Sequence, residues 1–322
     1  MAHEIHQMAY VGAAPWHGLG NRLSPNQPLE IWQREAGMDW KIESSPVYFR
    51  SEAEEGFPPA VAFHDQKVLY RSDTKQPLSV VSQRYQVVQP KDVLEFYREL
   101  TSASGYELET AGVLKGGRKF WALARTGHSI ALKGGDEVGG YLLLATSCDG
   151  TLATTATPTT VRVVCNNTLT VSLNGANEGI RVPHSTRFDA NRVKQQLGLA
   201  VSSWDEFMYQ MRTLAERKVS RAEADRFFTQ ALGATTLGAA PKGQQPNRHA
   251  ISKAKDLFEG RGKGSDLTSA RGTAWGLLNA VTEFVDHEKR ARSSDYRIDS
   301  AWFGPGAAVK QRALKCALSL VA

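Results

Sequence analysis

The chain has 322 residues, 41% of them hydrophobic and 22% charged, an ordinary composition for a globular protein with a sizeable core. No window holds the roughly 18 apolar residues that a membrane-spanning helix needs, and the N-terminus lacks the apolar segment of a secretory signal. Three scattered cysteines exclude a disulfide framework and suit a reducing compartment. We therefore expect a cytoplasmic protein with no membrane partner.

Charge is unevenly distributed along the chain. Residues 1–110 carry 10 Lys and Arg against 15 Asp and Glu, whereas residues 111–322 carry 29 against 18. A basic later part is compatible with a surface that binds a polyanion. The alternative is a solvated surface with arginine-rich helices.

The N-terminal third predicts short strands and one helix. Two glycines in Trp16–Gly20 (WHGLG) indicate a tight loop. Helical and alternating patterns then follow. The expected elements are a helix over residues 28–37, a strand over 40–49, a hairpin of 61–63 with 67–71 around His64-Asp65, and a strand over 78–81.

The middle of the chain predicts β-hairpins. A helix over residues 91–102 precedes strands 106–113 and 119–126, which are joined by a Gly-Gly turn. The Asp149-Gly150 step predicts a further, buried hairpin, with Pro158 at a bend, bulge or edge of its second arm. We interpret the segment from Asn166 onward as the capped start of a helix.

The last third reads as helical, which makes the fold class α+β: an antiparallel, β-hairpin-rich sheet with packed helices. We expect an α+β core over residues 1–188 and a helical part over 189–322. The expected helices cover 189–201, 204–218, 221–232, 251–260, 268–289 and 307–321, with a mobile connection near 233–249.

Motifs for enzymatic chemistry are missing from the sequence. There is no nucleophile elbow, Walker loop or dinucleotide fingerprint. His3, His6 and His17 match no zinc spacing, and the loop around Lys263 (GRGKGS) fails the Walker spacing, so a flexible basic loop is the preferred interpretation. We assign no catalytic residue, no metal ligand and no cofactor.

Basic and aromatic residues gather around the first predicted hairpin turn. Lys115, Arg118 and Lys119 crowd the turn, and Trp121 and Arg125 follow on the outgoing strand. Since alternate residues share one face of a strand, Lys119, Trp121 and Arg125 should point the same way. Cations along phosphates and an aromatic ring for base stacking are what single-stranded nucleic acid requires. Further cations could extend this surface: Arg162, Arg181, Arg187, Arg192 and Lys194. The alternative places Trp121 in the core.

Four motifs, in the order in which they occur, make the chain similar to a known family. They are WHGLG (Trp16–Gly20), SQRYQVVQP (Ser82–Pro90), VRVVCNNTL (Val161–Leu169) and SAWFGPGAAVKQRAL (Ser300–Leu314). With them the chain resembles, nearly end to end, the phage/plasmid-like protein family, a group of unknown function carried by phages, prophages and plasmids. The resemblance implies a mobile-element protein of the bacterial cytoplasm and brings no catalytic residues.

A second likeness is at the level of fold. The order helix, hairpin, hairpin, helix over residues 91–173 is similar to that of single-strand annealing proteins of the RecT/Red-beta and Rad-type superfamily. That likeness implies a groove for one DNA strand and a homo-oligomeric ring or filament. We therefore expect a non-enzymatic protein that holds single-stranded DNA and promotes annealing or recombination. The alternatives are a protein-binding module, such as an inhibitor of a host defence system, and a metal-dependent nuclease.

Overall fold

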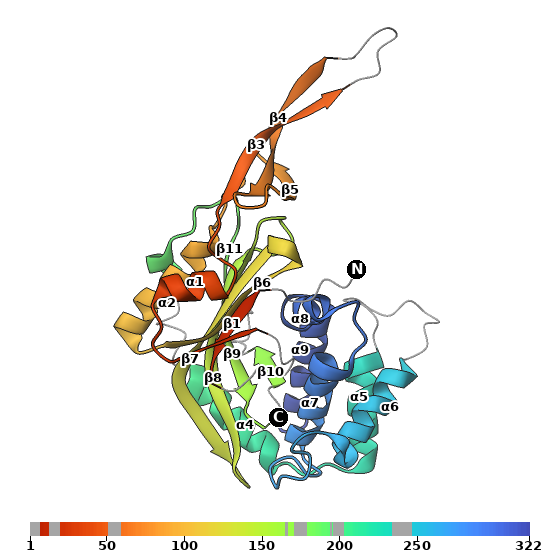
Figure 1. Ribbon diagram of the computed structural model, residues 1–322. Helices are drawn as coiled ribbons and strands as arrows, with labels where there is room; N and C mark the ends of the chain where they lie inside the picture. Colours follow the sequence, from red (N-terminus) through yellow and green to blue (C-terminus); the bar gives the residue numbers. More distant parts are fainter. Residues whose placement is uncertain are drawn as a thin grey trace.

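The computed structural model describes residues 7–12, 20–50, 59–164, 167–170, 179–193, 195, 203–233 and 247–322. The described elements form one large sheet, one small sheet and two groups of helices (Figure 1). Most of the WHGLG loop and of the expected mobile connection, like Lys194, falls outside the described residues.

The large sheet has the strand order β10-β9-β8-β7-β6-β1-β2, with β11 also paired to β9. Its strands are β1 (Met8–Val11), β2 (Asn21–Leu23), β6 (Glu107–Leu114), β7 (Lys119–Leu132), β8 (Asp136–Ser147), β9 (Thr154–Arg162), β10 (Asn167–Thr170) and β11 (Ile180–Val182). All pairs are antiparallel except β1 with β2, which are parallel, so the sheet is mixed. The α+β class is confirmed, and the expectation of a wholly antiparallel sheet is wrong.

Both expected central hairpins are present. The Asp149 carboxylate accepts hydrogen bonds from the backbone N–H and the hydroxyl of Thr151, and Gly150 adopts φ 74°, a combination that closes the turn between β8 and β9. On its other edge β9 pairs with β10 through residues 159–162 and with β11 through 154–156. Pro158, which has no N–H to donate, lies between these two stretches. The segment that begins at Asn167 is strand β10, so the expected helix there is wrong.

The small sheet extends away from the body as an arm (Figure 1). It consists of β3 (Ile42–Arg50), β4 (Ala60–Arg71) and β5 (Pro77–Ser82). We expect a hairpin turn at His64-Asp65, but both residues lie within strand β4, and the chain does not reverse there. Pro46 pairs with Lys67 and Val47 with Phe63, so residues 64–66 form a bulge and not a turn.

Helices cover both faces of the large sheet. Helices α1 (Leu29–Glu35) and α2 (Pro90–Ser104) lie on one face, where Phe120 and Ala122 of β7 join their core. The opposite face, with Trp121 and Leu123, packs against the C-terminal helices. These are α4 (Ser203–Glu216), α5 (Arg221–Gly233), α6 (Arg248–Asp256), α7 (Ala274–Glu283), α8 (Ser294–Phe303) and α9 (Pro305–Leu318). Short π-helical turns, Leu257–Arg261 and Phe284–Glu288, follow α6 and α7.

Candidate functional site

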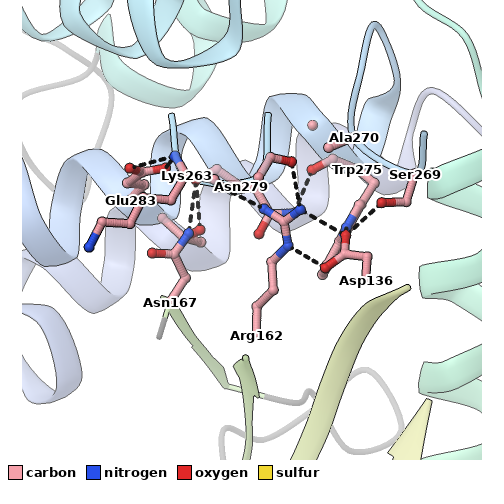
Figure 2. A network of polar contacts seen from close by, with 12 residues as sticks. Asp136, Arg162, Asn167, Lys263, Ser269, Ala270, Trp275, Asn279 and Glu283 are labelled. Atoms are coloured by element: carbon pink, nitrogen blue, oxygen red, sulfur yellow. Dashed lines mark hydrogen bonds and ion pairs between the residues drawn. The ribbon is translucent and has the colours of Figure 1, made fainter. Parts of the chain in front are cut away.

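A buried polar network lies where the large sheet meets the C-terminal helices (Figure 2). The Arg162 guanidinium forms a two-pronged ion pair with Asp136, at 2.7 and 2.8 Å. The hydroxyl of Ser269 and the indole N–H of Trp275 donate to the same carboxylate, at 2.6 and 3.0 Å. Burial by itself raises the pKa of Asp136, but these donors outweigh it and hold the pKa below its ordinary value.

This network is structural and connects the large sheet to the C-terminal part of the chain. The side chains of Arg162 and Asp136 are 2% and 0% exposed, so the expected contact of Arg162 with DNA phosphates does not fit its position. Arg162 also donates to the carbonyls of Lys263 and Gly264, and the Glu283 carboxylate accepts the backbone N–H of Lys263. The GRGKGS loop, expected to be flexible, is therefore anchored to the sheet.

A second buried ion pair joins the same layers. The Lys310 ammonium of α9 lies 2.8 Å from Asp286 and 2.7 Å from the hydroxyl of Thr168 on β10. The backbone N–H of Thr168 donates to the same carboxylate. Burial lowers the pKa of Lys310 despite Asp286. Each of these polar side chains is less than a tenth exposed, so a ligand does not reach them.

The predicted basic and aromatic face of β7 exists, but helix α8 covers it. Trp121 is 1% exposed and meets Trp302 edge to face with ring centroids 4.9 Å apart, so it belongs to the core and is not placed to stack a base. Lys119 is 5% exposed and forms an ion pair with Asp299. Lys115 lies 2.6 Å from the same carboxylate. Arg125 is exposed and pairs with Glu109 at 2.6 Å.

The remaining predicted cations lie at the surface. Arg118, Arg181, Arg187 and Arg192 are all exposed. Of the predicted cations that the structure describes, Arg181 alone lines the large groove described next. The structure therefore separates the sequence-predicted set into buried ion-pair partners and exposed arginines.

A groove of about 930 Å³ lies between β8, β9 and β11 of the large sheet and the C-terminal helices. We call it the basic groove. Its polar and charged lining residues are Thr155, Thr157, Thr170, Arg181, Asn247, Lys289, Gln311 and Arg312. Trp302 and Phe303, at the end of α8, form part of its apolar wall together with the start of α9.

The charge of the groove has one sign. Arg181, Lys289 and Arg312 contribute three cations, and none of the described lining residues is an Asp or Glu. Arg312 already has a partner within the chain, since its Nε donates to the carbonyl of Ala231 at 2.9 Å. Lys289 is half-buried, and burial lowers the pKa of its ammonium. Within the described parts of the chain, no carboxylate forms an ion pair with Lys289. An anion in the groove would supply that missing partner.

Sequence reasoning missed most of this site. Lys289 directly follows the π-helical turn Phe284–Glu288, and Arg312 lies in α9. Trp302 and Phe303 end α8, a helix that was not predicted from the sequence. The signal that could have found them is the SAWFGPGAAVKQRAL motif, because Trp302, Phe303 and Arg312 all belong to it and all line the groove.

Metal ligands, cysteines and long apolar helices bear on the alternative functions. Among the described residues, no three His, Cys, Asp or Glu side chains gather as metal ligands would. Burial raises the pKa of the Cys148 thiol to about 12, so its reactive thiolate is disfavoured. Within the same parts of the chain, no helix combines the length and apolar character that crossing a membrane requires.

A protein-family model matches a large part of the chain. This family model, described as "Domain of unknown function (DUF932)", matches residues 77–302, from the start of β5 to the last but one residue of α8. The match covers well over half of the chain. No curated protein matches it.

Proposed function

We propose that this chain, a member of the DUF932 family, binds single-stranded DNA in the basic groove and promotes strand annealing without catalysis. The observation that carries the proposal is a groove of about 930 Å³ with three cations and no carboxylate among its described lining residues. The proposal moves the main binding site from the hairpin turn near Lys115 to Arg181, Lys289 and Arg312. A role in a phage or plasmid is part of the same proposal.

The groove offers two kinds of contact that a single strand uses. Arg181, Lys289 and Arg312 match phosphates, and each phosphate that a cation neutralises releases counterions. Trp302 and Phe303 are half-buried at the groove wall and present aromatic surface to bases. The exposed Arg187 and Arg192 remain candidates for contacts outside the groove.

Fluorescence anisotropy with a labelled oligonucleotide tests this assignment. We expect binding that prefers single strands and whose logarithm falls with the logarithm of salt concentration, with a slope of about −0.7 for each phosphate contact. Arg181→Gln with Lys289→Gln should reduce that slope by about 1.4 and weaken binding. Arg34→Gln is the matched control, because Arg34 is an exposed cation on α1 outside the groove. Equal effects of the double variant and the control would refute the groove assignment.

The same preparation separates the alternatives. A protein-binding module predicts no DNA affinity after nuclease treatment, whereas a nuclease predicts oligonucleotide cleavage that depends on Mg²⁺ or Mn²⁺. Annealing is measured separately, as faster pairing of two complementary labelled strands. Binding without faster pairing would leave the groove as a single-strand site and remove the annealing role.

A further inference from the structure

The first turn of helix α8 carries an exposed aromatic ring with a cation from each of two distant segments beside it. Tyr296 is 42% exposed. The Lys115 ammonium, from the turn between β6 and β7, lies over the Tyr296 ring at 5.4 Å from its centroid. The Arg292 guanidinium, just before α8, lies over the same ring at 6.0 Å. Lys115 is partly exposed and Arg292 exposed, so a ligand reaches all three side chains. We call them the α8 subsite.

The surroundings of the α8 subsite have a surplus of positive charge. Asp299 of α8 pairs with both Lys115 and Lys119, so two cations share one carboxylate. A second carboxylate, that of the buried Asp295, accepts the backbone N–H of Lys115. Arg292 forms no ion pair with any carboxylate that the structure describes. Three cationic side chains against two carboxylates leave a net charge that attracts an anion.

The α8 subsite adjoins the basic groove at both ends of α8. Lys289, which lines the groove, is three residues before Arg292, so their Cα atoms lie within about 11 Å of each other. Phe303, which also lines the groove, follows Tyr296 by seven residues, about two helical turns or ~10 Å. The Lys119 ammonium lies 5.8 Å from the Phe303 ring centroid. Both rings are therefore on the side of α8 that faces the β6–β7 turn.

We infer that the α8 subsite holds a further nucleotide of the single strand that occupies the basic groove, with its base against Tyr296 and its phosphate at Lys115 and Arg292. This inference rests on the proposed function and gives the strand a path out of the groove along α8. A ring with cations beside it offers both contacts that single-stranded DNA uses, stacking for a base and charge for a phosphate. The cations that the sequence predicts at this hairpin turn thus have Tyr296, and not Trp121, as their stacking ring.

The length of the bound oligonucleotide tests the stacking contact. Anisotropy is measured with labelled oligothymidylates of ~4 to ~16 nucleotides, the range of single-strand site sizes. Tyr296→Ser should weaken binding of the longest by at least about fivefold, because one base loses its ring, and should leave the shortest, which the groove alone holds, unchanged. Tyr296→Phe keeps the ring and should bind as the wild type does. Tyr209→Ser is the matched control, because Tyr209 is a 68% exposed ring on α4 outside the groove.

The salt slope tests the phosphate contact. Arg292→Gln should reduce the slope for the longest oligonucleotide by about 0.7, and unchanged far-UV circular dichroism shows that the variants are folded. If Tyr296→Ser and Arg292→Gln bind the longest oligonucleotide as the wild type does, while Arg181→Gln with Lys289→Gln binds it weakly, the α8 subsite is overturned and the groove assignment stands. Loss of binding in the α8 variants alone would place the DNA on α8 and overturn the groove assignment instead. A wild type that binds no oligonucleotide overturns both.

Discussion

Lys289 is the residue that most strongly suggests that the basic groove binds an anion. Its ammonium is half-buried beside the apolar wall, burial lowers its pKa, and no described carboxylate compensates it. Such a group costs stability in the free protein, since the unfolded chain binds the proton more tightly. A cation kept at a cost is what a site for an anionic ligand needs.

Replacing this cation should therefore separate stability from binding. Lys289→Met should raise the free energy of unfolding, measured in urea, by up to ~1 kcal/mol; the gain is small because solvent screens the partly exposed ammonium. It should also weaken oligonucleotide binding. The gain in stability should shrink at alkaline pH, where the wild-type lysine becomes neutral at its lowered pKa. Lys91→Met, which changes an exposed lysine on α2, is the control. A variant that loses both stability and binding would indicate a packing role for Lys289.

Arg162 illustrates the opposite case, a buried cation whose partner is present. Arg162→Met should destabilise the protein by ~3–5 kcal/mol at neutral pH, because Asp136 would stay buried and charged without its ion-pair partner. Asp136 in the wild type has a lowered pKa, so its contribution to stability is present above pH ~4 and is lost as pH falls through the lowered value. In the variant, the two largest causes that lower this pKa are lost with Arg162, so burial raises the pKa of Asp136 although Ser269 and Trp275 still donate to the carboxylate.

The stability gap between the wild type and Arg162→Met should therefore narrow on acidification from pH 7 to pH 4, as measured by urea unfolding. Asp136→Asn together with Arg162→Met removes both charges and should recover part of the loss. A constant gap across this range would show that the Arg162–Asp136 ion pair is not what stabilises the contact between sheet and helices.

Strand β7 shows which features of a secondary-structure element can be predicted from local sequence. The alternation correctly places Lys119 and Trp121 on one face and predicts the β6–β7 hairpin. What covers that face depends on α8, about 180 residues later, and local periodicity carries no such information. The same limit applies at His64-Asp65, where a turn-like dipeptide is a bulge because β3 pairs across it. Elements with strong local patterns, such as α2 and α5, were predicted closely.

The covered face of β7 leads to a prediction about Trp121. Trp121→Leu should destabilise the protein by ~1–3 kcal/mol, through a cavity beside Trp302. The oligonucleotide Kd of the folded variant should change little, and its salt slope should not change at all. Phe303→Leu, at the groove wall, is the comparison: loss of a stacking ring should weaken binding by ~1–3 kcal/mol. If Trp121→Leu weakens binding as much as Phe303→Leu, Trp121 takes part in the site.

At the scale of the whole molecule, the sheet and the C-terminal helices depend on each other. One core cluster contains Ile130, Val138 and Leu169 of the sheet together with side chains of α4 to α9. Three buried or nearly buried polar contacts cross the same boundary: Lys119 with Asp299, Lys310 with Thr168, and Ser269 with Asp136. The order of strands before helices can be predicted from the sequence. The shared core cannot, since its contacts join residues that lie far apart in the chain.

This shared core predicts that the chain unfolds as one unit. Cutting it at residue 188 would expose the apolar face of β7 and leave Asp286 and Lys310 without Thr168, and Asp136 without Ser269 and Trp275. Buried polar groups that lose their partners cost ~1–3 kcal/mol each, so neither fragment should retain native structure. Urea unfolding of the full chain should show a single transition by fluorescence and by circular dichroism alike. Fragments 1–188 and 189–322 should each give poorly dispersed NMR spectra, and mixing them should restore dispersion if the interface alone supplies the missing order. Two separate transitions, or a well-dispersed spectrum from either fragment, would instead establish the boundary at residue 188 as a division between independent domains.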